Sequence, residues 1–575
     1  MPALAAVYDN IQQLPSTSYD FIIVGGGTGG SVVANRLSEN PTFQVLLIEA
    51  GPTNEGVLNS MVPYLAGALQ KTIYDWNYTT VPGVGLNNRT LDYPRGHILG
   101  GCSSHNNMFY TRGSKDDYDR WAQVTGDPGW SWEKLLPYIL KNERWSPPSD
   151  GHDTQGDFDP SVHGFSGIMF TSLPSAPQPI DDMILEVTKE QPSEFPYLLD
   201  MNAGRPLGLG WYQGSIGNGT RSSSATAYLS SKFTTRRNLH VLLNTKVTKV
   251  HPITGSPAPL RFGLVETTAN LLLTARREII LSAGPINTPH ILMNSGIGDR
   301  NALTEIGIRS VLHLPSVGKN LTDQPIAGVS YSVSSNDTLD NLIMNKTLQA
   351  IALAQWKLTR TGPYADAGPN FIAWARLADN SSIVRQFGDP SAGPNTPHLE
   401  LAPFSGSAFF LIPQPGHFVG IASVVVTPAS RGSVTLNRLD PLGKPYIDLG
   451  YYKSEFDILA MREALKLSQR FFKATVWRKY IIEQVAPPAN ATSDAELDEY
   501  IRSFSFTTNH AVGTAAMSAK NSQYGVVDPD LRVKGTMGLR IVDASVMPYI
   551  TSAHPQVPVY AISERASDLI KNLWN

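Results

Sequence analysis

Three glycines, Gly25, Gly27 and Gly30, form a G-x-G-x-x-G pattern directly after the apolar run YDFIIV at residues 19–24. The first permits a tight turn, the second lets backbone N–H groups approach a pyrophosphate, and the third lets a helix pack closely. Glu49 ends the next apolar run, where a carboxylate can accept from ribose hydroxyls and disfavours a 2′-phosphate. We predict dinucleotide binding rather than an ordinary glycine-rich turn; the motif disfavours NADP but does not separate FAD from NAD.

A second stretch whose residues could take part in binding or catalysis is GHILGGCSSHNNMFYTRG, residues 96–113. His105 lies in it between Ser104 and Asn106. Gly100 and Gly101 remove side chains that would hold this segment away from a bound group. We therefore expect a loop that lies very close to a ligand and carries a histidine there.

The sequence lacks the residues that several other kinds of functional site require. Cys102 is the only cysteine, which excludes an internal disulfide, a C-x-x-C redox pair and a cysteine-based zinc site. No two histidines are spaced i, i+3 or i, i+4, so we expect no metal site. The sequence contains no G-x-S-x-G elbow, which argues against a serine hydrolase.

The elements around these residues indicate two units. A strand, glycine turn, helix and strand occupy about residues 19–50; HVLLNTKVTKV (240–250) and REIILSAG (277–284) are predicted strands, and TPHILMNSG a helix. Between 326 and 505 the chain has aromatic- and proline-rich stretches such as FSGSAFFLIPQPGHF and alternating runs such as GIASVVVTP, typical of an antiparallel sheet with one covered face. FDILAMREALKLSQRFF (456–472) is a predicted amphipathic helix, and the final segments GLRIVDASVMP and AISERASDLIKNL return to a strand and a helix. We infer a cofactor domain made of separated pieces with a second domain inserted.

Length and charge limit the class of protein. A chain of 575 residues is too long for one ordinary core, and a net charge of −3 without a Lys/Arg run gives no nucleic-acid surface. No apolar run approaches the about 18 residues of a membrane span. The start, MPALAAVYDNIQQLP, lacks a signal-peptide pattern. Eight sequons predict a secreted, extracellular glycoprotein whose signal has been removed, at Asn77, Asn88, Asn218, Asn320, Asn336, Asn345, Asn380 and Asn490.

Two further segments, TTNHAVGTAAMS with His510 and TSAHPQVPVYAISERA with His554, complete a pattern. Together with the glycine motif and GPINTPHILMNSGIG (284–298), they make nearly the whole chain resemble the glucose-methanol-choline (GMC) flavin oxidoreductases. The resemblance implies an α/β Rossmann-like FAD-binding domain with an inserted α+β substrate domain. The expected boundaries are 17–325 for the FAD domain, with a substrate-domain excursion near 160–210, then 326–505 for the substrate domain and 506–575 for the return.

Within the family, YDWNYTTVP, YPRGHILGGCSSHN, DPSVHGFSG and LDMNAGRPLGLGW resemble the fungal aryl-alcohol oxidase and pyranose dehydrogenase branch, the last three more the pyranose dehydrogenases. The wider family carries an aliphatic residue where His105 stands and a small residue where Cys102 stands. In pyranose dehydrogenases a histidine of this loop is bonded to the flavin 8α carbon. The resemblance therefore implies covalent FAD at His105; the alternative is a histidine that only hydrogen-bonds within the loop.

The resemblance also assigns roles to the paired histidines. His510 would be the catalytic base that takes the hydroxyl proton, while flavin N5 takes the hydride. His554 would hydrogen-bond the substrate oxygen and aim its carbon. The residues expected to contact the cofactor are Gly25, Gly27, Thr28, Gly30, Glu49, Arg95, Gly100, His105, Asn106, Val247, Asp543, Ala544, Gln556 and Val557.

The favoured function is FAD-dependent oxidation of sugars, pyranoses or oligosaccharides, with electrons passed to quinones or other organic acceptors. The first alternative is an aryl-alcohol oxidase that acts on benzylic alcohols and reduces O2 to H2O2. The second is a non-oxidising relative such as a hydroxynitrile lyase, or a non-catalytic flavoprotein. We expect a monomer without nucleic-acid or membrane partners.

Overall fold

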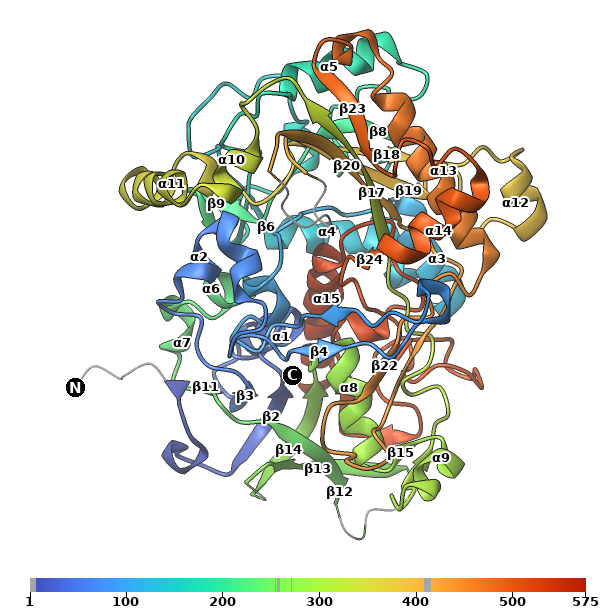
Figure 1. The fold of residues 1–575 in the computed structure, drawn as a ribbon. Helices are drawn as coiled ribbons and strands as arrows, with labels where there is room; N and C mark the ends of the chain where they lie inside the picture. Colours follow the sequence, from blue (N-terminus) through green and yellow to red (C-terminus); the bar gives the residue numbers. More distant parts are fainter. Residues whose placement is uncertain (1–6, 254, 256–258, 270, 408–414) are drawn as a thin grey trace.

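The structure is a computed structural model that describes residues 7–253, 255, 259–269, 271–407 and 415–575. Part of the predicted aromatic- and proline-rich stretch, residues 408–414, lies outside the described residues, as do the first six residues of the N-terminal segment. The fold contains two large sheets, one in the lower and one in the upper half of Figure 1. Helix α15 (Gln556–Trp574) runs between them.

The first sheet has nine strands and a parallel centre. Along its main path the strands are β1 (Val7–Tyr8), β11 (Leu239–Leu242), β3 (Val45–Ile48), β2 (Ser18–Val24), β14 (Leu272–Leu281), β13 (Leu260–Thr267) and β12 (Val247–Pro252). The runs that form β2 and β3 are almost continuously apolar because both faces of a parallel sheet are covered. Helices α1 (Thr28–Leu37) and α15 pack against each other beside it, and α4 (Trp132–Asn142) packs on α15.

The far end of the chain completes this sheet. Strand β26 (Leu539–Ile541) lies parallel to β14, and β25 (Thr536–Met537) pairs with β13. Strand β14 leads into α8 (Gly284–Asn294), which confirms the helix predicted for TPHILMNSG (288–296), although α8 begins four residues earlier and ends two residues earlier. The predicted single strand at 240–250 is wrong: β11 and β12 are separate, because the chain turns between them with Asn244 at φ 53°.

The second sheet has seven strands, all antiparallel to their neighbours. In order they are β23 (Ile481–Ala486), β17 (Pro325–Val333), β20 (Phe418–Val425), β19 (Leu399–Phe404), β18 (Phe371–Ala375) and β8 (Gly208–Trp211), with β24 (Phe506–Thr507) beside β17. The antiparallel sheet next to a Rossmann-like sheet confirms the predicted fold class. Strands from outside residues 326–505 join it at both ends, and the domain boundaries themselves stay predictions.

The expectation that one face of this sheet is open to water is wrong. Every residue of β19 and β20 is buried. Helix α13 (Glu455–Phe471) covers one face, where Leu401 and Ile421 share a core with Ala464. Ala402 and Ala422, on the other face, line an internal cavity. The central strands are therefore enclosed on both sides.

Smaller elements surround the two sheets. The remaining helices are α2 (Leu58–Met61), α3 (Lys115–Thr125), α5 (Asp181–Glu190), α6 (Ser224–Tyr228), α7 (Ser231–Thr234), α9 (Arg300–Glu305), α10 (Leu339–Met344), α11 (Lys346–Thr359), α12 (Ser382–Phe387) and α14 (Asp494–Phe504). The remaining short strands are β4 (Tyr78–Thr79), β5 (Asp92–Tyr93), β6 (Glu143–Trp145), β7 (Met169–Thr171), β9 (Ile216–Gly217), β10 (Thr220–Arg221), β15 (Ile297–Gly298), β16 (Leu312–His313), β21 (Ser433–Thr435) and β22 (Tyr446–Asp448).

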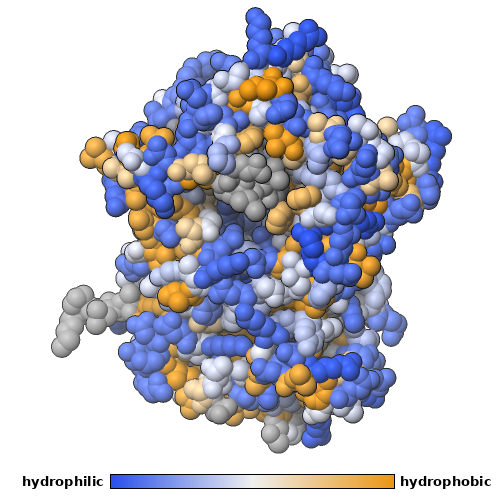
Figure 2. Space-filling view, viewed as in Figure 1, coloured by the Kyte–Doolittle hydropathy of each residue, from blue (hydrophilic) through white to orange (hydrophobic). Residues whose placement is uncertain are grey.

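Polar residues dominate the face drawn in Figure 2. An apolar group lies over the projecting helix α11 at the left of that view, and its exposed members include Ile351 and Leu358. Among the described residues, no helix combines the length and the apolar character that crossing a bilayer requires.

A buried cluster of charged side chains anchors the segment that follows His105. The Arg112 guanidinium donates to Glu143 at 2.8 Å, and His163 lies between Glu143 (2.9 Å) and Asp200 (2.8 Å). The side chains of Arg112, Glu143 and His163 are fully buried. Burial lowers the pKa of His163, but its hydrogen bonds to Asp200 and Glu143 outweigh this, so the pKa is raised above its ordinary value. An imidazolium at His163 balances the charge of the cluster.

We predict that His163→Leu lowers the free energy of unfolding by about 3–5 kcal/mol, because it leaves buried carboxylates without their cationic partner. Since the folded-state pKa is raised, the stabilisation is fully present below the unfolded pKa of about 6.5 and is lost as the pH rises through the folded value. Thermal unfolding of both proteins across pH 5–9 measures this. The gap between their midpoints should narrow as the pH rises; a gap that widens contradicts the imidazolium assignment.

Candidate active site

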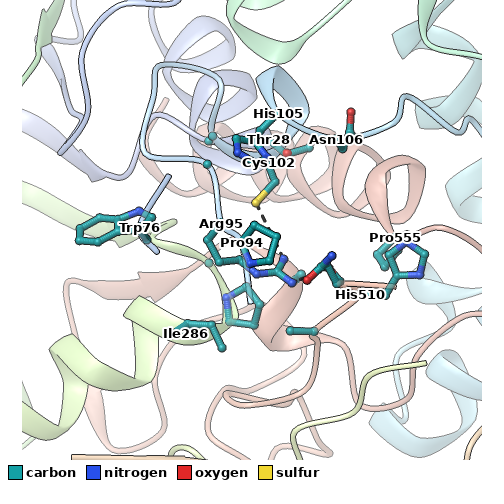
Figure 3. A pocket seen from close by; sticks show the side chains of 18 of the residues that line it. Thr28, Trp76, Pro94, Arg95, Cys102, His105, Asn106, Ile286, His510 and Pro555 are labelled. Atoms are coloured by element: carbon teal, nitrogen blue, oxygen red, sulfur yellow. Dashed lines mark hydrogen bonds between the residues drawn. The ribbon is translucent and has the colours of Figure 1, made fainter. Parts of the chain in front are cut away.

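A cavity of about 740 Å³ extends from the glycine-rich turn to the paired histidines. Residues of the first sheet and its loops, including Gly25 and Glu49, line one part. Residues of the second sheet, including Ile326 and Val424, line another. Figure 3 shows Trp76 and His510 on opposite sides of Arg95 within this cavity.

The glycine-rich turn joins β2 to α1 in a conformation that side chains would block. Gly25 has φ +104°, and a Cβ there would lie 2.4 Å from the Ser282 carbonyl oxygen. A Cβ at Gly30 would lie 1.9 Å from the Gly25 carbonyl oxygen, so this glycine lets α1 pack onto the turn. Gly25 and Gly27 line the cavity. The turn therefore has the geometry predicted for a pyrophosphate site.

Glu49 reinforces this turn from the end of β3. One carboxylate oxygen accepts from the Gly26 N–H and the other from the Gly51 N–H, both at 2.8 Å. Burial raises the pKa of Glu49, and the backbone hydrogen bonds oppose that rise. Glu49 also lines the cavity. A carboxylate has about four acceptor positions, so ribose hydroxyls can still bind to it.

The loop with His105 is pressed onto the glycine-rich turn. The Gly100 N–H donates to the Gly26 carbonyl at 2.7 Å. Gly100 and Gly101 have φ +89° and +52°, and a Cβ at Gly101 would lie 2.7 Å from the Gly27 Cα. The glycine pair therefore brings the loop against the turn, and the expected closeness of the loop to a bound ligand stays a prediction.

His105 is 8% exposed and lines the cavity, and its Nε2 has no hydrogen-bond partner among the described residues. Burial lowers the pKa of His105 to about 4, helped by the charges of Arg221 and Arg95 and opposed by Asp75. The imidazole is therefore neutral at pH 7. A neutral, buried ring nitrogen without a partner has the lone pair that a nucleophile needs.

A buried guanidinium lies behind this loop. Arg221 donates from Nε to the Ser60 carbonyl at 2.7 Å and from Nη1 to the Asn106 side-chain oxygen at 2.8 Å. Burial lowers its pKa to about 9. Among the described residues, no carboxylate forms an ion pair with Arg221. Its positive charge contributes to the lowered pKa of His105.

His510 is held with one ring nitrogen protonated. Its Nδ1 lies 2.6 Å from the Gln324 side-chain oxygen. The Gln324 amide nitrogen donates to the carbonyls of Val426 (2.7 Å) and Thr551 (3.3 Å), which fixes the orientation of the amide. The proton of a neutral His510 therefore sits on Nδ1, and Nε2 carries the lone pair. Burial, the nearby His554 and Arg95 lower the pKa of His510 well below its ordinary value, so the ring is neutral.

His554 has a different environment. Its Nε2 lies 3.1 Å from Glu400, and its ring stacks on Phe109 at 4.2 Å with an interplanar angle of 14°. Its backbone N–H donates to the Thr111 hydroxyl at 2.9 Å, in the segment that the buried charge cluster anchors. The rings of His510 and His554 are 4.6 Å apart and nearly perpendicular. Two imidazoles so arranged can share one hydroxyl group.

Three helices point their N-termini at the cavity. Helices α1, α8 and α15 begin at Thr28, Gly284 and Gln556, all of which line it. The partial positive charges of these ends favour an anionic ligand. Asp543 lines the cavity and ties the end of β26 to α8, because its Oδ2 accepts from the Gly284 N–H at 2.9 Å.

Most of the predicted site residues meet at this cavity. Those that line it are Gly25, Gly27, Thr28, Glu49, Arg95, His105, Asn106, Val247, His510, Asp543, Ala544, His554 and Gln556. Gly30 and Gly100 act through backbone packing, and Val557 lies in the first core. The sequence did not single out Gln324, Glu400 or Phe109. Gln324 and Glu400 belong to no recognisable motif, and the alternation of LELAPF (399–404) was the available signal for Glu400. Phe109 lies within the predicted loop segment 96–113, but nothing there assigned it a role.

The residues present fit a flavin dinucleotide. Gly27 and Gly101 leave the cavity wall without side chains. Five buried polar atoms of the described lining residues lack protein partners, namely Arg95 Nε, His105 Nε2, Ser282 Oγ, Asn509 Oδ1 and Gln556 Nε2. Within the described part of the chain, no group of three His, Cys, Asp or Glu side chains is arranged to hold a metal ion.

We predict that Gly101→Ala lowers the flavin-to-protein ratio of the purified protein. A side chain there must adopt φ +52° and collide with Gly27, which costs about 1–3 kcal/mol. Visible absorbance against protein concentration measures the ratio. Gly67→Ala is the matched control, because a Cβ at Gly67 meets nothing within 4 Å. Equal flavin content in both variants would show that the loop does not need this contact.

Comparisons with known proteins agree with this geometry. Residues 19–326 and 428–563 match the N-terminal and C-terminal parts of the GMC oxidoreductase family. The chain is 43% identical to pyranose dehydrogenase 3 of Leucoagaricus meleagris over 584 residues, covering 98% of this chain and 95% of the relative. It is 42% identical to dehydrogenase eriK of Hericium erinaceus over 586 residues, covering 99% and 96%.

Solved structures share the fold. An FAD-dependent oxidoreductase from Chaetomium thermophilum superimposes with a TM-score of 0.87 and 30% identity, covering 96% of this chain and 99% of that one. A fungal aryl-alcohol oxidase gives a TM-score of 0.82 and 28% identity, covering 97% and 100%. The chain therefore belongs to the GMC oxidoreductase family, and it is an FAD-dependent oxidoreductase that acts on an alcohol or a sugar.

Proposed function

We propose that this enzyme oxidises a hydroxyl group of pyranose sugars and passes the electrons to quinones or other organic acceptors. The observation that carries the proposal is the pair of perpendicular imidazoles, His510 and His554, at the end of the cavity. The identity to pyranose dehydrogenase 3 supports a sugar as the substrate. Bound FAD supplies the hydride acceptor at N5.

The two histidines divide the work on the substrate oxygen. His510 accepts the hydroxyl proton at Nε2, because Gln324 keeps the other nitrogen protonated and burial keeps the ring neutral. His554 orients the same oxygen, because Phe109 and Glu400 hold its ring from the face and the edge. Apolar residues around them, such as Ile326 and Val424, exclude water.

An aryl-alcohol oxidase is the second candidate, favoured by the likeness to such an enzyme and by the cavity-lining ring of Phe109. Mixing the protein with glucose or with a benzylic alcohol, with and without O2, separates the two. Flavin bleaching reports reduction, and recovery of colour in air reports oxidase activity. Reduction by glucose without reoxidation in air is the expected result. Faster reduction by the benzylic alcohol with recovery in air would favour the oxidase.

We also propose that FAD is bonded to His105. Neutral, unpartnered Nε2 is the atom expected to join the flavin 8α carbon. Such a bond would hold the flavin through His105. It would require the loss of one hydrogen from the 8-methyl group and one from the imidazole, as two protons and two electrons that an organic acceptor would take up. The bond would raise the reduction potential of the flavin, since an alkylated imidazole withdraws electron density.

We also propose that the protein is secreted. Seven of the eight sequon asparagines are exposed. Asn320 is the exception: its side chain contacts the Pro548 carbonyl and the Arg431 guanidinium. A chain that carries glycans at exposed sequons is typical of the secretory pathway.

We predict that His510→Ala slows flavin reduction by sugar about 10²–10⁴-fold, the usual contribution of a general base. The flavin spectrum and the fold should be retained, because the change removes only the ring. Anaerobic stopped-flow absorbance measures the rate. His152→Ala, at an exposed histidine, is the control. A near-normal rate in His510→Ala would rule out this residue as the base.

We predict that acid precipitation leaves the flavin in the protein pellet. The tryptic peptide of residues 96–112 should gain the mass of FAD, and fragment ions should assign it to His105. The same peptide contains His97, whose Nδ1 lies 2.8 Å from the Ile73 carbonyl, so it is an internal control. Flavin in the supernatant together with an unmodified peptide would refute the bond.

A further inference from the structure

The wall of the cavity formed by the second sheet contains one charged side chain among its described lining residues. The other members of this wall, on β17, β19, β20 and β24, are Ile326, Ala402, Ala422, Val424, Phe506 and Thr507. Glu400 stands among them on β19. A buried carboxylate on a wall with no other charged side chain is costly unless something binds to it.

Glu400 is only partly satisfied by the protein. It is 2% exposed, and its cross-strand neighbours are Trp374 and Val424. One carboxylate oxygen, Oε1, lies 3.1 Å from His554 Nε2. The other, Oε2, has no hydrogen-bond partner among the described residues, and it is not among the fully enclosed atoms that lack one. Glu400 lines the cavity beside His510 and His554.

We propose that Glu400 determines substrate specificity, because its Oε2 accepts a hydrogen bond from a second donor group of a polyhydroxy substrate. This inference rests on the proposed function. A carboxylate only accepts hydrogen bonds, so it binds hydroxyl groups or an ammonium group. The cavity thus takes neutral or amino sugars and rejects sugar acids, whose carboxylate would lie near a like charge.

The same oxygen discriminates against benzylic alcohols. Their single hydroxyl is bound by His510 and His554, so no donor is left for Glu400. The aromatic ring would then cover Oε2 and leave a buried charged acceptor without a hydrogen-bond donor. A site built to bind a polar group strongly disfavours a substrate that lacks that group, because its own polar atom is left unpaired. Glu400 therefore favours a substrate with at least two neighbouring donor groups.

The test compares substrates on the holoenzyme and on Glu400→Gln. The probes are glucose, glucosamine, glucuronate and a benzylic alcohol, and the readout is kcat/KM together with anaerobic flavin reduction. In the native enzyme, kcat/KM for glucuronate and for the benzylic alcohol should each be about 10–100-fold lower than kcat/KM for glucose. For glucosamine, kcat/KM should equal or exceed the value for glucose. In Glu400→Gln the ratio of glucuronate to glucose should rise at least about 10-fold, and the advantage of glucosamine should disappear.

The ratio of kcat/KM for two substrates is measured on the same variant, so any effect of Glu400 on the orientation of His554 enters both values and cancels. A uniform loss of kcat for all probes with unchanged ratios would overturn the inference and make Glu400 a positioning residue for His554. Equal rates for glucose and glucuronate in the native enzyme would overturn it while leaving sugar oxidation intact. Flavin reduction by the benzylic alcohol alone would overturn the proposed function as well. Glu305→Gln, the same change at a surface carboxylate, is the matched control.

Discussion

The contact between two glycine turns is the constraint on which the active site depends. The turn after β2 and the loop at Gly100 and Gly101 touch backbone to backbone, because side chains are absent on both sides. Ser224 joins them from a third segment, since its hydroxyl lies 3.3 Å from the carbonyls of both Gly27 and Gly100. This contact sets how far His105 stands from the dinucleotide turn. Segments that are distant in sequence thereby form one rigid wall.

The paired histidines have different hydrogen-bond partners behind them. A neutral amide, Gln324, backs His510 and orients its proton without adding charge. A carboxylate, Glu400, lies 3.1 Å from the Nε2 of His554. The His105 ring resembles His510, since burial and nearby guanidinium groups keep both neutral. Three histidines in one cavity thus differ through their partners rather than through their own chemistry.

The sequence predicted those parts of the molecule that local patterns encode. The helices α1, α8 and α13 follow from apolar spacing and turn residues, and the glycine turn follows from its fingerprint. It did not predict Glu400 or Gln324, because their contacts depend on strand pairing. His554 and Glu400 are 154 residues apart, and only the register of β19 with its neighbours turns Glu400 toward the cavity. The burial of β20 on both faces likewise depends on α13 on one side and, on the other, on residues distant in sequence such as Phe109 and Tyr212.

The order of the chain has a consequence for synthesis. The first sheet begins at β1 and gains β26 only near the end, and α15 supplies the last wall of the cavity. A nascent chain that stops before residue 554 contains the glycine turn and the His105 loop but neither His554 nor Gln556. Domains assemble as their segments emerge from the ribosome, so this cavity closes last. Capture of the flavin in this cavity consequently requires that the start of α15 has been synthesised.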